Sequence, residues 1–170
     1  MSGRFCIDAN GLITSWNVYY RPTVVPSLWQ QLSLNKLDIL LVQPIFDEIV
    51  QISAVDKKLP IEEQRRRFPL RSWLIDHAFT ATDLTPDAEV LSLQLEREYE
   101  TDQYSKGAGQ VDINLIAFAK LMSKTVVTYE GRQPEAPGKK SNYKIPLICR
   151  EQNVECIDFI TMLERLQICI

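Results

Sequence analysis

The sequence predicts an α/β fold in which a mostly parallel sheet is covered by helices on both faces. Short apolar runs alternate along the chain with segments of helical periodicity, which is the order that parallel strands and their connecting helices require. One run, at residues 37–42, is almost continuously apolar, as expected of a strand buried on both faces. The chain has 170 residues, 45% of them hydrophobic, which suits one domain with a sizeable core, here residues 1–170.

The first half of the chain is expected to hold two strands and a succession of helices. Pro26 and Pro44 each stand where a helix can begin, and Pro69 interrupts a helical pattern. The expected elements are a strand at residues 5–8, a turn at Asn10-Gly11, a helical segment at 12–20, a helix at 26–32, a strand at 37–42, a helix from Pro44 with an apolar stripe of Ile45, Ile49, Ile52 and Val55, and a helical stretch at 60–78.

The second half continues the alternation with two further strands. Thr85 and Pro86 form a typical helix start, with threonine as the cap and proline at the first helical position. Residues 110–123 are helical in pattern and nearly all apolar, which indicates a central, well-covered helix. The expected elements are a helix from Thr85, a loop at 100–109, a helix at 110–123, a strand at 125–128, a polar loop at 131–144, a short helix from Ile145, a strand at 154–157 and a helix at 159–166.

The composition excludes several classes of protein. The formal net charge is −3, so a nucleic acid would have to bind to a local basic patch or through metal ions. The single histidine, His77, has no elbow-motif nucleophile near it, which argues against Ser-His-Asp and Cys-His catalysis, and we expect it on a helix, exposed or partly buried. The glycine-rich loops of nucleotide-binding folds are missing. No apolar run has the length of a signal peptide core or a membrane helix, so a cytoplasmic location is expected.

The four cysteines, Cys6, Cys149, Cys156 and Cys169, form no C-x-x-C pair. With only one histidine in the chain, their spacing does not support a zinc site. We expect the cysteines to be small buried hydrophobic residues in a reducing compartment.

Four acids stand where the ends of strands and the starts of helices should bring them together. Asp8 ends the first apolar run, and Glu130 follows the run at 125–128. Glu48 lies just inside one expected helix, and Asp112 opens another. In an open α/β sheet these positions line the ligand crevice, and carboxylates there typically hold a hard divalent cation against a phosphate. Two carboxylates about 4 Å apart repel by roughly 4 kcal/mol at an effective dielectric near 20, so a converging cluster needs a cation or a proton.

Each of these acids also has a purely structural interpretation. Asp8 could cap the turn before Gly11. Glu48 and Asp112 could be acids in the first turns of helices, where the helix dipole favours them. Glu130 could be a solvated loop charge.

Four segments resemble, in order, the motifs of PIN-domain nucleases, the family of the VapC-like toxin ribonucleases. Residues 5–13 (Phe-Cys-Ile-Asp-Ala-Asn-Gly-Leu-Ile) resemble the opening strand and turn, and residues 43–49 (Gln-Pro-Ile-Phe-Asp-Glu-Ile) the second motif. Residues 111–120 (Val-Asp-Ile-Asn-Leu-Ile-Ala-Phe-Ala-Lys) are similar to the third, and residues 126–131 (Val-Val-Thr-Tyr-Glu-Gly) to the fourth. The tail also resembles a PIN-like subgroup of bacteria and archaea.

This resemblance implies a PIN-like three-layer α/β/α sandwich with a central, mostly parallel sheet of about five strands. It also implies a metal-dependent endoribonuclease that hydrolyses RNA phosphodiester bonds, often the toxin of a type II toxin–antitoxin pair. By this analogy Asp8, Glu48 and Asp112 hold Mg²⁺ or Mn²⁺, and Glu130 extends the catalytic site. The analogy makes Asn10 and Thr128 polar contacts that support the site or touch phosphate.

The chain departs from the family pattern at three places. Some relatives carry an acid at the position of Gln110, so its amide weakens the case for a second metal. Glu130 is one methylene longer than the more usual aspartate, and the loop at 131–144 is longer than in compact relatives. The alternative function is therefore a catalytically weak or inactive PIN-like interaction module. A phosphatase with an aspartyl intermediate is disfavoured because Asp8-Ala9-Asn10 lacks the second acid of an Asp-x-Asp motif.

Several partners are consistent with these predictions. RNA could contact the basic loop 132–144 and the run Arg65-Arg66-Arg67, which could equally be a flexible loop and a solvated helix face paired with Glu62 and Glu63. An antitoxin helix in a groove, or a second copy of the chain, is a further candidate. The aromatic residues that could line such a face, or simply pack in the core, are Trp16, Tyr19, Tyr20 and Trp29.

Overall fold

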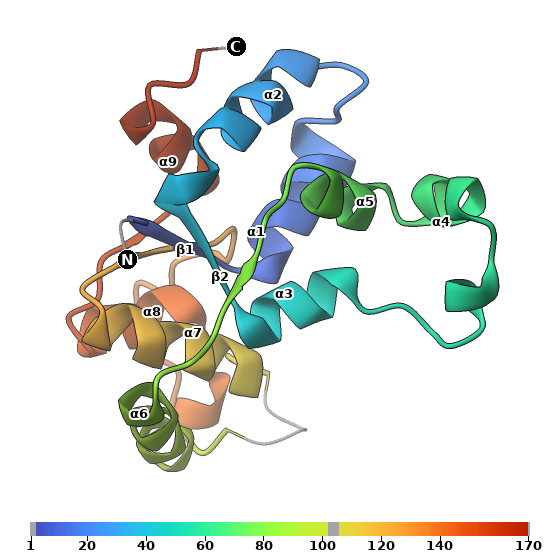
Figure 1. Ribbon diagram of the computed structural model, residues 1–170. Helices are drawn as coiled ribbons and strands as arrows, with labels where there is room; N and C mark the ends of the chain where they lie inside the picture. The colour runs from blue at the N-terminus through green and yellow to red at the C-terminus, as the bar shows by residue number, and fades with distance from the viewer. Residues whose placement is uncertain (1–2, 102–105, 170) are drawn as a thin grey trace.

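The fold is an α/β/α sandwich around a sheet of five parallel strands (Figure 1). The computed structural model describes residues 3–101 and 106–169, so part of the loop expected at 100–109 lies outside the described residues. The strand order is β3-β2-β1-β4-β5. The strands are β1 (Phe5–Ile7), β2 (Ile39–Val42), β3 (Ala81–Thr82), β4 (Thr125–Val127) and β5 (Cys156–Ile157). The predicted fold class is confirmed.

Helices cover both faces of this sheet. Figure 1 shows α1, α2, α5 and α9 on one side and α6, α7 and α8 on the other, while α3 follows directly from β2. The helical elements are α1 (Ala9–Thr14), the π-helical turn η1 (Ser15–Tyr19), α2 (Pro26–Leu34), η2 (Lys36–Asp38), α3 (Gln43–Val50), η3 (Asp56–Lys58), α4 (Ile61–Arg67), α5 (Pro69–Asp76), α6 (Pro86–Glu98), α7 (Gln110–Leu121), η4 (Lys140–Asn142), α8 (Ile145–Glu151) and α9 (Phe159–Arg165).

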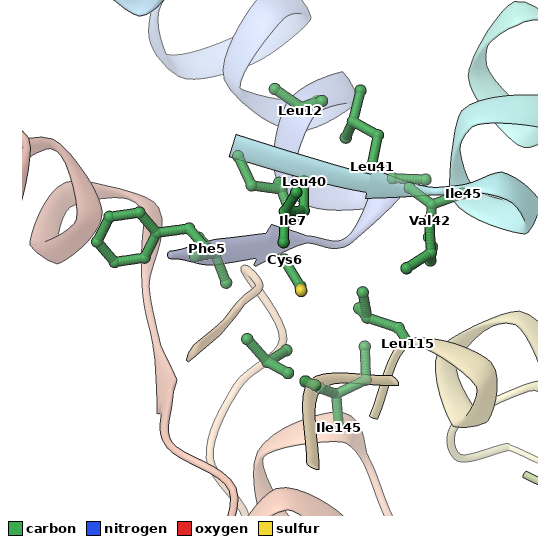
Figure 2. Close-up of a cluster of buried hydrophobic side chains, with 14 of the residues drawn as sticks. Phe5, Cys6, Ile7, Leu12, Leu40, Leu41, Val42, Ile45, Leu115 and Ile145 are labelled. Atoms are coloured by element: carbon green, nitrogen blue, oxygen red, sulfur yellow. The ribbon is translucent and has the colours of Figure 1, made fainter. Parts of the chain in front are cut away.

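The core is built on both faces of the central strands. Figure 2 shows Cys6 of β1 pointing toward Leu115 and Ile145, while Leu12 and Leu41 lie on the other side of the strands. All of these side chains are buried. Burying one large aliphatic side chain stabilises a fold by about 1.5–3 kcal/mol, so this two-sided core fixes the strand ends from which the functional residues project.

Three local predictions were wrong. Asn10-Gly11 does not form a turn but lies inside α1, because the Asp8 side chain caps a helix there. Helix α3 ends at Val50 instead of continuing to Val55, and Val55 is 73% exposed. Strand β3 was not anticipated, because a strand of two half-buried residues shows no periodicity and forms only through its pairing with β2.

The three tryptophans form one aromatic cluster beneath the helices of the α1 side. The ring centroids of Trp16 and Trp29 lie 4.6 Å apart, and those of Trp29 and Trp73 lie 5.2 Å apart. Trp16 and Trp29 are therefore core residues. Tyr19 is different, because 61% of it is exposed.

The single histidine and the cysteines occupy ordinary structural positions. His77 follows α5 and is partly buried, with its ring Nδ1 2.8 Å from the Trp73 carbonyl oxygen. All four cysteines are free; Cys6 and Cys149 are buried as expected, Cys156 is partly buried, and Cys169 is exposed, contrary to expectation. Among the helices that the structure describes, none is long and apolar enough to span a lipid bilayer.

Candidate functional site

The candidate site lies at the carboxyl ends of β1 and β4, in the middle of the sheet. Ile7 and Val127 are register partners, so the residues that follow them, Asp8 and Thr128, emerge side by side. The Asp8 amide donates a hydrogen bond to the Val127 carbonyl at 3.0 Å. Strand order reverses here, because β1 is followed along the chain by β2 on one side and has β4 on the other. Such a switch point is where open α/β sheets bind ligands.

Asp8 is held by two hydrogen bonds at this position. It is 4% exposed, and its Oδ1 accepts from the Asn10 amide at 3.3 Å as the cap of α1. Its Oδ2 accepts from the Thr128 hydroxyl at 3.0 Å. The Thr128 hydroxyl in turn accepts from the Glu130 amide at 3.1 Å, which ties the two acidic segments together. Burial raises the pKa of Asp8, although these hydrogen bonds oppose the rise.

Glu130 reaches across to the start of α8. Its Oε2 accepts from the Ile145 amide at 2.7 Å, so it is not a freely solvated loop charge. Burial is the main cause of the raised pKa of Glu130, and the negative charge of Asp8 adds to it. Lys144 lowers the same pKa and is the nearest positive influence on this acid.

Asp112 lies in the first turn of α7, as predicted. Its Oδ2 accepts from the Gly109 amide at 2.8 Å, so Asp112 does cap the start of α7, as the structural interpretation predicted. The pKa of Asp112 is nevertheless raised to about 7, first by burial and then by the charges of Asp8, Glu130 and Glu48. A carboxyl group with this pKa is partly protonated at neutral pH, which shows that the capping bond alone does not satisfy its charge.

Glu48 completes the group from α3. Glu48 is exposed as a whole residue. Its carboxyl group is nevertheless partly shielded from solvent, and this shielding, followed by the charge of Asp8, raises the pKa of Glu48. The structure therefore brings Asp8, Glu48, Asp112 and Glu130 close enough for their charges to interact, and we call these four residues the acid site.

The other predicted site residues differ in their placement. Thr128 is buried and bonded within the acid site, as described above. Asn10 and Gln110 are exposed. The Asn10 side chain accepts from the Thr14 hydroxyl at 2.7 Å, and Gln110 is the first residue of α7. Within the described residues, neither side chain hydrogen-bonds to a carboxylate of the acid site.

The charges of the acid site are not neutralised by ion pairs within the described residues, although the charge of Lys144 acts on Glu130. Among the residues that the structure describes, none of its four carboxylates forms an ion pair with a basic side chain. Within residues 3–101 and 106–169, no three histidine, cysteine, aspartate or glutamate side chains approach closely enough to form a ready-made metal centre. An all-carboxylate donor set still fits Mg²⁺, because this ion keeps several waters and commonly takes only one or two protein carboxylates beside substrate phosphates.

One supporting contact, which we call the loop seam, was not predicted from the sequence. The loop before α7 hydrogen-bonds to the loop before α8: the Gly107 amide donates to Ser141 O at 3.1 Å, and the Ala108 amide donates to Tyr143 O at 2.8 Å. A Cβ at residue 107 would overlap the Tyr143 backbone, so only glycine allows this approach. The Gly-Ala-Gly run at residues 107–109 predicted a turn, but no pattern in the sequence predicted its contact with residues 141–143.

Comparison with known proteins places the chain in a family. The sequence profile of a domain of unknown function, DUF4411, matches residues 5–170. The chain belongs to the DUF4411 family. No curated protein matches this DUF4411 chain by sequence.

Two solved structures resemble the DUF4411 chain in fold. VapBC2 from Rickettsia felis, crystallised with a DNA fragment from its promoter, matches with a TM-score of 0.54 and 16% identity, over 91% of this chain and 98% of that one. FitAcB from Neisseria gonorrhoeae matches with a TM-score of 0.50 and 16% identity, over 90% of this chain and 96% of that one. At this identity the similarity shows the fold alone, and it agrees with the predicted PIN-like architecture.

Proposed function

We propose that this DUF4411 protein is a metal-dependent endoribonuclease that hydrolyses RNA phosphodiester bonds. The observation that supports it is the acid site: four carboxylates at the switch point of the sheet, which repel one another and form no ion pair with a basic side chain of the described residues. Structural acids are normally paired or solvated, so an arrangement that raises the pKa of each member favours a functional role.

In this proposal Asp8, Glu48 and Asp112 hold Mg²⁺ or Mn²⁺, and Glu130 extends the site. When bound, the cation supplies positive charge to the phosphoryl oxygens in the transition state and makes water a usable nucleophile near neutral pH. Gln110 offers a neutral amide where an acid would favour a second cation, so we propose one metal.

The chain's own residues prepare this site in the absence of metal. The Thr128 hydroxyl orients Asp8, and the Ile145 amide fixes Glu130. Because the pKa of Asp112 is raised to about 7, this carboxyl group must release a proton before it can act as a ligand near neutral pH. Cation affinity should therefore fall as the pH is lowered below 7.

The biological setting we propose is the toxin of a type II toxin–antitoxin pair. It is supported by the motifs shared with VapC-like toxins and by the fold similarity to chains of VapBC2 and FitAcB. The implied protein partner is an antitoxin, with a homodimer as a further possibility, and the implied location is the cytoplasm.

The proposal is tested by incubating purified protein with RNA and Mn²⁺. Asp8→Asn should abolish cleavage. The matched control is Asp38→Asn, because Asp38 lies just before β2, at the opposite ends of the strands from Asp8, and forms a surface ion pair with Arg4 at 2.9 Å. Cleavage that persists in Asp8→Asn would show that the activity belongs to a contaminant.

A second candidate function is a PIN-like interaction module without turnover. It is favoured by one observation, the lack of a ready-made group of three ligands among the described residues. Calorimetric titration with Mn²⁺ separates the two functions. No heat of binding at millimolar Mn²⁺, together with unchanged stability in Glu48→Gln, would favour the interaction module.

A further inference from the structure

Two adjoining hollows lie beside the acid site near the end of β5. One hollow, of about 280 Å³, is lined in part by Thr128 and Glu130 of the site. A second hollow, of about 400 Å³, extends to Arg150 of α8. The two share Arg132, Pro146 and Cys156 as lining residues, so they adjoin one another, and we call them together the β5 groove.

Two arginines of the β5 groove have no ion-pair partner among the described residues. Arg132 and Arg150 are both exposed. Within the described part of the chain, neither guanidinium forms an ion pair or a hydrogen bond with another side chain. The charge of Arg132 acts on Asp158, whose carboxylate already accepts from the Thr161 amide at 2.8 Å as the cap of α9. Both arginines are therefore available to an anionic ligand.

An exposed aromatic ring adjoins the same groove. Tyr129 lines the groove, and its ring centroid lies 5.2 Å from that of Tyr19 on one side and 5.9 Å from that of Phe159 on the other. Phe159 is fully buried, whereas Tyr19 is 61% exposed. Tyr129 is thus anchored in the core and supports Tyr19 at the surface. Exposed aromatic rings beside cationic grooves are the platforms on which single-stranded nucleic acids stack their bases.

We propose that the β5 groove binds the single-stranded segment of RNA that adjoins the scissile phosphate. Arg132 contacts a backbone phosphate of that segment, Arg150 a more distant one, and Tyr19 stacks on a base. The occupant follows from the two arginines, which have no ion-pair partner among the described residues, and from continuity with the acid site, since Glu130 lines both. This inference rests on the proposed ribonuclease function.

The test measures RNA binding without metal, so that it does not depend on cleavage. A fluorescent single-stranded RNA of about ten nucleotides, within the usual range of such sites, is titrated by anisotropy in EDTA. Arg132→Ala should raise the Kd at least about five-fold and reduce the slope of log Kd against log salt by about 0.7. Tyr19→Ala should raise the Kd by a similar factor, while Tyr19→Phe, which keeps the ring, should stay within about two-fold of wild type.

The matched control is Arg66→Ala, an exposed arginine on α4 that pairs with Glu63, which should bind RNA as wild type does. Wild-type RNA binding in both Arg132→Ala and Tyr19→Ala would overturn the inference. Duplex RNA that binds as tightly as single-stranded RNA, with no effect of Tyr19→Ala, would also overturn it.

Failure of this inference can be distinguished from failure of the proposed function. If RNA binds through Arg132 and Tyr19 but Mn²⁺ produces no cleavage, the groove stands and the ribonuclease proposal fails. If RNA is cleaved in an Asp8-dependent manner but Arg132→Ala and Tyr19→Ala leave KM unchanged, the ribonuclease proposal stands and the groove assignment fails.

Discussion

The α4 segment and the acid site are both dense in charge, but only the α4 segment neutralises its charge internally. Arg66 donates to both Glu63 carboxylate oxygens, at 2.9 and 2.8 Å. Arg67 contacts Glu63 at 2.9 Å and Asp56 at 3.3 Å, and Arg65 contacts Asp76 at 3.0 Å. Figure 1 shows α4 projecting away from the sheet. The α4 ion-pair network consists of Asp56, Glu63, Arg65, Arg66, Arg67 and Asp76.

Charge density alone does not identify a functional site. The run Arg65-Arg66-Arg67 is the most basic stretch of the sequence, yet each guanidinium has a carboxylate partner in the structure. This favours the interpretation of a solvated helix face over an RNA contact. The acid site has the opposite character, since its members raise one another's pKa. The two regions should therefore respond in opposite ways to mutation and to pH.

The largest expected effect comes from removing the hydroxyl that links the acid site. Thr128→Val keeps the shape of the side chain but removes the donor to Asp8 and the acceptor for the Glu130 amide. Supporting groups of this kind contribute about 10- to 100-fold to metal affinity, and a buried polar group left without a partner costs about 1–3 kcal/mol. We expect both losses, measured by Mn²⁺ calorimetry and urea unfolding. Wild-type Mn²⁺ affinity in Thr128→Val would show that Asp8 needs no orientation by this residue.

A smaller effect of opposite sign is expected when charge is removed from the acid site itself. Asp112→Asn keeps an oxygen that can accept from the Gly109 amide but removes a carboxylate that burial and three neighbouring acids destabilise. At pH 8 without metal the variant should be more stable than wild type by roughly 1–2 kcal/mol. Thermal unfolding should show a higher Tm. A lower Tm would mean that the capping bond outweighs the repulsion.

The third expected effect is a difference between the acid site and the α4 ion-pair network in how stability depends on pH. The folded-state pKa of Asp112 is about 7, above the ordinary value of 3.8, so its stabilising contribution is complete below about 4 and is lost as the pH rises toward 7. The Tm of metal-free wild type should therefore fall from pH 5 to pH 8 more steeply than that of Asp112→Asn. Added Mn²⁺ should restore stability at pH 8 more than at pH 5. Parallel Tm curves for the two proteins would contradict this account.

The smallest effect is expected in the α4 ion-pair network. Hydrogen bonds from Arg66 and Arg67 lower the pKa of Glu63, so its contribution is present above the unfolded value of about 4.5 and is lost as the pH falls. Glu63→Gln should reduce the Tm slightly at pH 8 and not at pH 3, because exposed ion pairs contribute little. A rise in Tm at pH 8 would remove the distinction between the two regions.

The sequence was sufficient to predict the fold class, and it named the four acids whose charges interact in the structure, while their function as a site stays a prediction. Pro44 and the Gly-Ala-Gly run mark where α3 and α7 begin, and the strand ends of β1 and β4 place Asp8 and Glu130. Such signals are local and can be identified without coordinates. Whether these acids hold a metal stays a prediction.

The parts that could not be predicted depend on contacts between distant segments. Strand β3 exists only through its pairing with β2. The β5 groove needs the loop after β4, the helix α8 and the strand β5 to meet, and no local pattern marks Arg132 as different from Arg66. Tyr19 packs against Tyr129, which follows more than a hundred residues later, and no local pattern in the sequence indicates this contact.

The loop seam has a consequence for how the protein can vary. The amides of Gly107 and Ala108 donate hydrogen bonds to the carbonyls of residues 141 and 143, and Glu130 accepts one from the Ile145 amide. These hydrogen bonds hold the chain before and after residues 134–139. Gly138 itself is exposed, and a Cβ there would touch nothing within 4 Å. The segment between these hydrogen bonds is therefore a natural insertion point. A reporter group placed at Gly138 should leave the acid site undisturbed, and length changes there would reshape the rim of the β5 groove without altering the acid site.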